Sequence, residues 1–190
     1  MVNYDLIDLI KNKYLSNNKA DVLKHVENVA EIAVELAKTY NLDIDKIELA
    51  ALLHDVSGIM TSQEMYEFAK AHGLETDPAE EKYHALLHQR ISKIIAQEDF
   101  KITDSDILNA IECHTTLKKN SSMYDKVIFI ADKISWDPKS VPSYSDLLKD
   151  NIVESLDEAC LIYIKYQFDN NLLVMPHHWI IEAYEDLRKA

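Results

Sequence analysis

Apolar residues in this chain recur at helical spacing, and no stretch alternates with a period of two. One clear stripe is formed by Val26, Val29, Ala30, Ala33, Val34 and Ala37. Only 2 glycines and 4 prolines occur among 190 residues, so few positions favour tight turns or interrupt a helix. Because this spacing places the apolar side chains on one helix face, the sequence predicts an all-α protein built from long helices.

Start and stop signals divide the chain into separate helices. Thr61 and Glu64 form a predicted capping box, and Gly73 ends the helix that follows. Pro176 is predicted to lie at a helix start. The predicted helices cover residues 4–15, 25–40, 43–54, 61–71, 79–97, 103 or 104 to 114, 124–134, 146–168 and 176–187, with loops over 74–78 and 136–145. We expect a helical bundle of about eight to ten helices in a single domain, residues 1–190.

Composition argues against several protein classes. Hydrophobic residues make up 47% of the chain, which suits one compact domain. The net charge of -13 argues against a nucleic acid duplex as partner, because duplex binding usually needs a basic patch. No apolar run approaches the ~20 residues needed to span a membrane. The N-terminus has no signal-peptide pattern, and Cys113 and Cys160 form no Cys-x-x-Cys pair. A cytoplasmic protein without a disulfide framework is expected.

Side chains that can bind metal interrupt the apolar helices in a fixed order. His54 and Asp55 follow the apolar run 47–53, where burying either group is costly unless it is paired or bound to a metal ion. Asp132 lies beside Lys133, but adjacent residues do not face each other on a helix, so a metal ion is its expected partner. Each residue alone has a structural explanation, such as a helix cap. The ordered set favours metal binding: His25, His54, Asp55, His88, His114 and Asp132.

The chemistry of this set narrows the function. Imidazole and carboxylate ligands together suit iron, zinc, manganese, nickel or cobalt. The two oxygens of Asp55 could bridge two such ions. Two ions roughly 3.5–4 Å apart can polarise a phosphoryl group and activate a water molecule near neutral pH. This chemistry needs no serine or cysteine nucleophile, and it predicts a metal-dependent phosphohydrolase.

The segments that carry these residues resemble the HD-domain superfamily of metal-dependent phosphohydrolases, and within it the YqeK-like family. The resemblance covers nearly the whole chain and rests on residues 25–37, 50–55, 86–88, 106–116, 125–132 and 175–187. It implies symmetrical hydrolysis of diadenosine tetraphosphate to ADP by two divalent transition metal ions, with iron as the first candidate. One ion would be held by His25, His54, Asp55 and Asp132, and the other by Asp55, His88 and His114. The catalytic residues would be Asp55 and His54.

The resemblance also distinguishes two histidines on one predicted helix. His84 and His88 are spaced i, i+4 and share a helix face, which would itself suit a metal. His88 falls on the Leu-Leu-His position of the family, and its separation from His114 fits without a gap. His84 is therefore the second choice as a ligand.

Several positions around the predicted site depart from the family pattern. Val22 replaces an arginine before the first histidine, and Gly58 replaces a lysine after the His-Asp pair. The other departures are Gln89 and Arg90 for a glycine and a proline, Glu112 for an arginine, and the segment 135–139. Lys118, Lys119, Arg90 and Lys139 could substitute for the lost charges. The predicted substrate-binding residues are Thr115, Thr116, Lys118 and Arg90.

Three functions remain open from the sequence. The first is symmetrical cleavage of diadenosine tetraphosphate. The second is hydrolysis of another nucleotide, and the third is a metal-retaining nucleotide-binding or regulatory module with weak catalysis. In each, the expected partner is a small-molecule nucleotide, and a homodimer is one possible assembly. The missing arginine and lysine positions favour the third function, whereas the intact ligand set argues against it.

Overall fold

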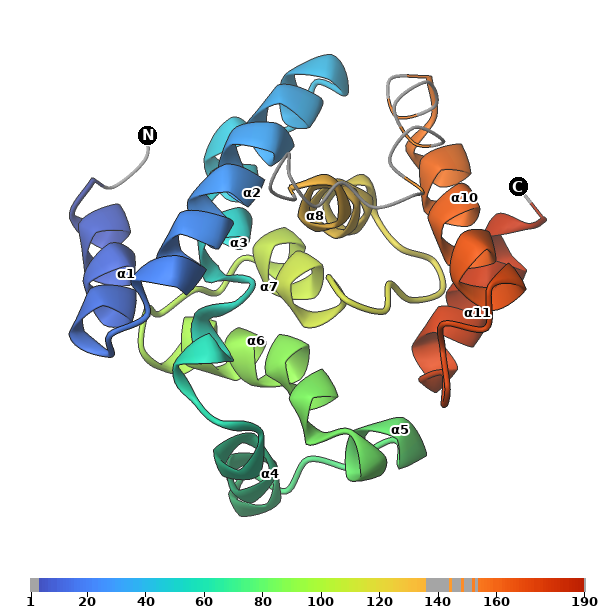
Figure 1. Ribbon diagram of the computed structural model, residues 1–190. Helices are drawn as coiled ribbons and strands as arrows, with labels where there is room; N and C mark the ends of the chain where they lie inside the picture. The colour runs from blue at the N-terminus through green and yellow to red at the C-terminus, as the bar shows by residue number, and fades with distance from the viewer. Residues whose placement is uncertain (1–3, 136–143, 145–147, 149–151, 153, 190) are drawn as a thin grey trace.

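The computed structural model describes residues 4–135, 144, 148, 152 and 154–189 (Figure 1). Within these residues every regular element is helical, as the sequence predicted. The α-helices are α1 (Tyr4–Ser16), α2 (Ala20–Thr39), α3 (Ile44–Leu53), α4 (Ser62–Ala71), α5 (Pro78–Lys82), α6 (His88–Glu98), α7 (Ser105–Glu112), α8 (Met123–Ile134), α10 (Leu156–Asp169) and α11 (His178–Leu187). Two 3₁₀ helices, η1 (Val56–Ile59) and η2 (His84–Leu87), complete the described elements.

Helix α8 forms the centre of the molecule, and Figure 1 shows it nearly end-on. Helices α2, α3, α7 and α10 all pack against it. This arrangement follows from its sequence, because five consecutive residues from Val127 to Ala131 are apolar and fully buried. An element that is apolar on all sides must be covered on all sides. Asp132 follows this run directly, and α8 therefore carries a half-buried carboxylate at the end of its buried segment.

Helices α2 and α3 form an antiparallel pair beside α8, and α1 packs against both. The Asp43 side chain caps α3 by accepting a hydrogen bond from the Lys46 amide. Tyr14 of α1 is fully buried, and its hydroxyl donates to the Leu52 carbonyl over 2.8 Å. Helix α2 begins at Ala20, five residues before the predicted start at His25, so the histidine lies within the helix.

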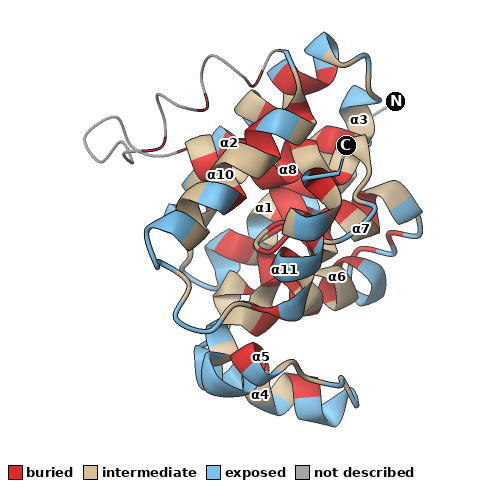
Figure 2. Ribbon diagram, turned by 90° about the vertical axis from the view of Figure 1, so that its right-hand side faces the viewer, coloured by how far each residue is buried: buried red, intermediate tan, exposed pale blue. Residues whose placement is uncertain are grey.

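The helix predicted over 79–97 is wrong in one respect, because the structure divides it into α5, η2 and α6. Tyr83 leaves the helix with φ −124° and ψ 79°. No glycine or proline marks this break. The chain changes direction there, and His88 becomes the first residue of α6. Helices α4 and α5 project from the rest of the molecule and carry much exposed surface (Figure 2).

The C-terminal helices cover the opposite side of α8 (Figure 1). Helix α11 starts later than predicted: His177 is its N-cap, so Pro176 precedes the helix. The predicted loop over 136–145 and the first part of the helix predicted over 146–168 fall largely outside the described residues, and α10 begins at Leu156 after its cap, Ser155. Among the described helices, none combines the length and the apolar character needed to cross a membrane.

Candidate metal centre

The structure brings the six predicted metal ligands together from five parts of the chain. His25 comes from α2, and Asp132 comes from α8. His54 and Asp55 follow α3, His88 opens α6, and His114 follows α7. Their ligand atoms form three overlapping groups, each within 4.8 Å: His25, His54 and Asp55; His54, His114 and Asp132; Asp55, His88 and His114.

Asp55 lies between two pairs of histidines. Its Oδ2 is 3.8 Å from Nε2 of His25 and 3.7 Å from Nε2 of His54. Its Oδ1 is 3.5 Å from Nε2 of His88 and 3.3 Å from Nε2 of His114. Each carboxylate oxygen therefore faces a different pair of imidazoles, which is the arrangement that a bridging carboxylate needs.

The two oxygens of Asp132 have different partners. Oδ1 lies 3.1 Å from Nε2 of His25 and 3.8 Å from Nε2 of His54. Oδ2 accepts a hydrogen bond of 2.6 Å from Nζ of Lys133. The prediction that Lys133 would not pair with its neighbour was wrong, because the long lysine stem folds back along the helix. One oxygen of Asp132 thus faces the histidines, and the other is bonded to the Lys133 ammonium group.

Three histidines share one backbone contact that fixes their protonation. Nδ1 of His54, His88 and His114 lies 2.7, 2.6 and 2.9 Å from the carbonyl oxygen three residues earlier, that of Ala51, Ala85 and Ile111 respectively. A carbonyl oxygen only accepts, so each Nδ1 carries the proton. In the neutral ring, Nε2 then holds the lone pair that a metal ion needs.

These lone pairs are suited to a cation. Nε2 of His88 and Nε2 of His114 are only 2.9 Å apart. Nε2 of His54 is buried, and no hydrogen-bond partner satisfies it in the described residues. Two neutral imidazoles that direct lone pairs at one another repel unless a positive centre lies beside them. The donor set therefore fits transition metal ions such as iron, zinc, manganese, nickel or cobalt.

Burial and neighbouring groups favour the metal-binding protonation states of Asp55 and His114, whereas the hydrogen bond with Asp132 raises the pKa of His25. Burial alone would raise the pKa of Asp55, but the surrounding imidazoles of His54, His88 and His114 outweigh it and hold that pKa far below the usual range. Burial lowers the pKa of His114 to about 4, so its imidazole is neutral near pH 7. The side chains of His25 and Asp55 are 34% and 26% exposed, so the centre is open to solvent on one side.

Two buried polar side chains that sequence reasoning missed support the ligands. The Ser57 hydroxyl donates to the His88 carbonyl over 2.9 Å. Gln89 is fully buried, and its Oε1 accepts from the amides of Thr115 and Thr116 over 3.1 and 3.3 Å. Gln89 thus holds the loop after His114 against the first turn of α6, next to His88. The sequence did contain a sign of this role. Gln89 is a polar residue next to a predicted ligand, on a helix face that is otherwise mostly apolar.

His84 lies apart from the described ligand groups. Its ring stacks on Tyr66 of α4 with centroids 3.9 Å apart and an interplanar angle of 4°. His88 is the member of this pair whose Nε2 faces Asp55, at 3.5 Å.

The predicted substrate residues have different surroundings. The Thr115 hydroxyl is 2.9 Å from Nε2 of His88, at the centre itself. Thr116 is buried and bonded to Gln89. The Lys118 ammonium contacts Asn109 and Glu112. Arg90 contacts Glu75 and Glu80, and Lys139 lies outside the described residues.

The two small residues at the departures from the family pattern lie side by side. A Cβ atom built on Gly58 would lie 3.4 Å from Cγ1 of Val22. Gly58 follows the His54–Asp55 pair, and Val22 is one helical turn before His25. The positions of the missing lysine and arginine therefore form one apolar spot at the rim of the centre.

A second group of possible ligands, Asp77, His177 and His178, lies at the N-termini of two helices, where Asp77 and His177 are the caps. The Asp77 side chain caps α5, and Nδ1 of His177 accepts from the Trp179 amide at the start of α11. Nδ1 of His178 lies 2.7 Å from Asp77. Two helix N-termini meet there, and their positive ends disfavour a cation. His177 itself is only 3% exposed.

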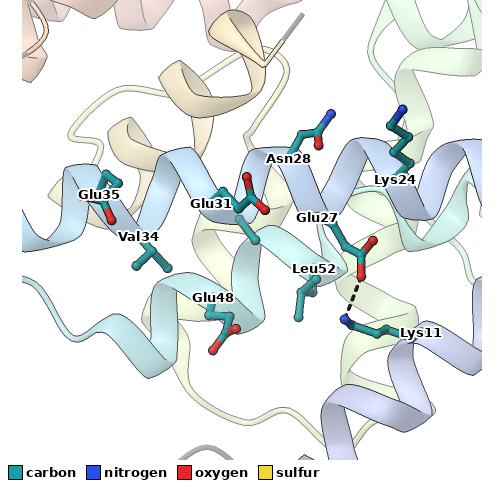
Figure 3. A pocket seen from close by; sticks show the side chains of 10 residues that line it. Lys11, Lys24, Glu27, Asn28, Glu31, Val34, Glu35, Glu48 and Leu52 are labelled. Atoms are coloured by element: carbon teal, nitrogen blue, oxygen red, sulfur yellow. Dashed lines mark ion pairs between the residues drawn. The ribbon is translucent and has the colours of Figure 1, made fainter. Parts of the chain in front are cut away.

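A hollow of about 850 Å³ between α1, α2 and α3 contains none of the six ligands (Figure 3). Its wall is charged, with Glu31, Glu35 and Glu48 on one part and an ion pair between Lys11 and Glu27 on another. Repulsion from the glutamates makes this hollow a poor site for a polyphosphate, whereas the predicted cation ligands lie in the His/Asp centre.

Comparison with known proteins agrees with this geometry. The sequence model of the HD domain matches residues 22–137, a range that includes all six predicted ligands. An uncharacterized protein in the pepC 5' region of Lactococcus lactis subsp. cremoris is 40% identical over 139 residues, covering 73% of this chain and 71% of that protein. The symmetrical bis(5'-nucleosyl)-tetraphosphatase of Staphylococcus aureus is 33% identical over 124 residues, covering 65% of this chain and 62% of that enzyme.

A solved structure matches the whole fold. It is the crystal structure of a predicted HD superfamily hydrolase involved in NAD metabolism from Clostridium acetobutylicum. The TM-score is 0.88 at 31% sequence identity, and the match covers 100% of this chain and 98% of that one. The match of the family model, the fold and the clustered histidines and aspartates agree, and they confirm the resemblance drawn from the sequence: this chain belongs to the HD-domain family.

Proposed function

We propose that this HD-domain hydrolase is a dinuclear-metal enzyme that cleaves diadenosine tetraphosphate symmetrically into two molecules of ADP. The observation that carries the dinuclear part is Asp55, whose two oxygens face two separate pairs of histidines. The name of the Staphylococcus aureus relative, and the same name in Bacillus subtilis at 31% identity, support the substrate.

The ligand geometry suggests how two ions would be shared. His25, His54, Asp55 and Asp132 would hold one ion, and Asp55, His88 and His114 the other. When bound, two such ions supply Lewis-acid polarisation of a phosphoryl group and a hydroxide near neutral pH. Iron is the first candidate, with manganese, zinc, nickel and cobalt as alternatives. The structure offers no nucleophilic serine or cysteine among the described residues at the centre.

The chain's own residues contribute alignment. The carbonyl contacts of His54, His88 and His114 hold the rings in one tautomer before any ion arrives. Preorganised charge and dipoles supply much of the rate of phosphoryl transfer. The Thr115 hydroxyl lies beside His88 and is the described polar group best placed to bind a phosphate oxygen.

Charged contacts to phosphate are few at this centre. The ammonium of Lys118 and the guanidinium of Arg90 are each paired with a glutamate, and Val22 and Gly58 carry no charge. We therefore expect slower turnover than in a family member that keeps the arginine and the lysine. A lost charged hydrogen bond costs about 1.5–3 kcal/mol, which is about one to two decades in rate.

A substrate screen tests the proposal. Purified protein is loaded with ferrous iron or manganese and offered diadenosine tetraphosphate, mononucleotides and cyclic nucleotides, with products separated by chromatography. ADP as the sole nucleotide product from diadenosine tetraphosphate is expected, because attack falls on a phosphorus beside the central bridging oxygen. AMP plus ATP would contradict symmetric cleavage. A variant Asp55→Asn is the control for residual activity of contaminants.

A second candidate rests on the uncharged spot formed by Val22 and Gly58. Without the lysine and arginine, the chain could hydrolyse a shorter nucleotide or act as a metal-retaining nucleotide-binding module. Turnover of a mononucleotide in the same screen favours the first, and binding of nucleotide without turnover by fully metallated protein favours the second. A cytoplasmic location and a homodimer stay predictions.

A further inference from the structure

Lys133 is a buried lysine. Its charge partner among the described residues is Asp132, a proposed metal ligand. The residue is 8% exposed. Its Nζ lies 2.6 Å from Oδ2 of Asp132, the neighbouring residue on α8. Buried lysines are rare unless they are paired, because removing an ammonium group from water is costly. The pairing with Asp132 is therefore built into the core.

Aromatic rings hold this ammonium group in place. Nζ lies 5.3 Å from the ring centroid of Phe129, one turn earlier on α8, and 6.0 Å from that of Tyr163 on α10. Phe129 is fully buried. The lysine stem is therefore packed between two helices, and the head has little freedom to leave Asp132. Cation–π contacts of this kind add to the hold.

The pairing leaves Asp132 with one oxygen for the histidine cluster. Oδ1 lies 3.1 Å from Nε2 of His25, whereas Oδ2 is bonded to Lys133. Asp55 is the contrasting case, because both of its oxygens face imidazoles. Two carboxylates of the same centre are thus set up differently: one offers both oxygens and the other offers one.

We propose that Lys133 is a positioning residue that confines Asp132 to a single metal-facing oxygen. This inference rests on the proposed metal centre. A carboxylate that binds through one oxygen occupies one coordination position instead of two. The position left open is available to an anionic oxygen of the substrate, so the effect of Lys133 is to preserve phosphate binding at the ion held by His25 and Asp132.

The test uses the full-length protein reconstituted with cobalt(II), whose visible absorption weakens as the coordination number rises. In Lys133→Met, Oδ2 of Asp132 is released, and we expect two bound cobalt equivalents with weaker absorption than in the parent protein. Inorganic phosphate, used as the probe, should bind about tenfold more weakly, which is within the range for changed outer-shell partners of metal ligands. Lys133→Arg should retain parent-like absorption and phosphate affinity.

A matched control lies on the same helix. Lys126 of α8 pairs with Asp157 of α10, and neither residue is a proposed ligand. Lys126→Met removes a lysine–aspartate pair that is more exposed than the pair of Lys133 but lies on the same helix, so it should leave the cobalt spectrum and the phosphate affinity unchanged. Thermal unfolding of both variants shows how much each loses in stability alone.

The outcomes separate the two proposals. If the parent protein binds no cobalt, the metal centre itself is refuted. If the parent binds two equivalents and Lys133→Met keeps the same spectrum and phosphate affinity, the role of Lys133 is overturned. Loss of one cobalt equivalent in Lys133→Met overturns the single-oxygen assignment, since Lys133 would then retain Asp132 in the centre and not limit it. Equal changes in Lys126→Met overturn it too, because they would reflect general damage to α8.

Discussion

Arg90 offers a direct test of whether a cation near the centre serves the substrate or the fold. The sequence predicted that it binds substrate, but its Nη1 lies 2.8 Å from Oε2 of Glu80 and 2.8 Å from the Glu75 carbonyl. Glu80 is fully buried. The change Arg90→Met keeps a long apolar stem and removes the guanidinium, so it leaves a buried carboxylate without its cation.

The magnitude follows from what remains around Glu80. Removing one partner of a buried ion pair typically costs about 3–5 kcal/mol. The Asp77 amide still donates to Glu80 over 2.9 Å, and Nε2 of His177 lies 3.5 Å away. The Arg90 side chain is also 18% exposed. We therefore expect a loss near the lower limit, about 3 kcal/mol, or about 6–12 °C in melting temperature for a chain of this length.

The pH dependence gives the sign of the effect. Burial alone would raise the pKa of Glu80, but the nearby His177 imidazole and the hydrogen bond from the Asp77 amide, with the charge of Arg90, outweigh it and lower that pKa below its usual value of 4.5. The stability from this pairing is present above pH 4.5 and is lost as the pH falls through the lower folded-state pKa. The difference between Arg90→Met and the parent should therefore shrink in acid.

Urea unfolding of the metal-free proteins at several pH values measures this difference, and Glu80→Gln combined with Arg90→Met should recover part of the loss. Steady-state kinetics of the loaded enzymes should show little change in KM. A variant as stable as the parent but with a strongly raised KM would refute the structural role and return Arg90 to the substrate site.

Further predictions concern the centre itself. Asp55→Asn should reduce bound metal, measured by elemental analysis, and unchanged content would remove Asp55 as the bridge. His88→Ala should lose metal and activity while His84→Ala keeps most of both, because His88 and not His84 faces Asp55; the reverse pattern would refute the ligand assignment. Gly58→Lys should raise kcat/KM about tenfold, and more when Val22→Ala relieves the 3.4 Å contact; kinetics showing no gain in either variant would exclude a phosphate contact there.

The clustering of the six predicted ligands could be predicted because such residues are rare beside apolar helix positions. Histidine and aspartate next to apolar helix positions are costly without partners, so their order along the chain carried information about contacts distant in sequence. The central burial of α8 followed equally from the apolar run that ends at Ala131. In both cases the free-energy cost of placing a side chain in the wrong environment, polar in the core or apolar in water, determines where the residue must lie.

Other features depended on contacts that no local pattern reveals. The break at Tyr83 has no glycine or proline, and it arises where α5 ends and η2 packs against α4. The helical spacing rule describes where Cβ atoms point, so it failed for Lys133, whose flexible stem reaches its neighbour. Arg90 pairs with Glu80 across the break in the predicted helix. Because the sequence did not reveal this break, it also did not reveal the pairing, and Arg90 was predicted to bind substrate.

The carbonyl contacts of the three histidines have a consequence for the metal-free state. In each, the ring is held from behind by the turn of backbone that precedes it. The entropy of aligning these rings is therefore lost when the chain folds and not when an ion arrives, so ions meet a receptor that is already assembled. Chelation should empty such a receptor without unwinding its helices, and the protein would exchange one metal for another as supply changes while its fold stays the same.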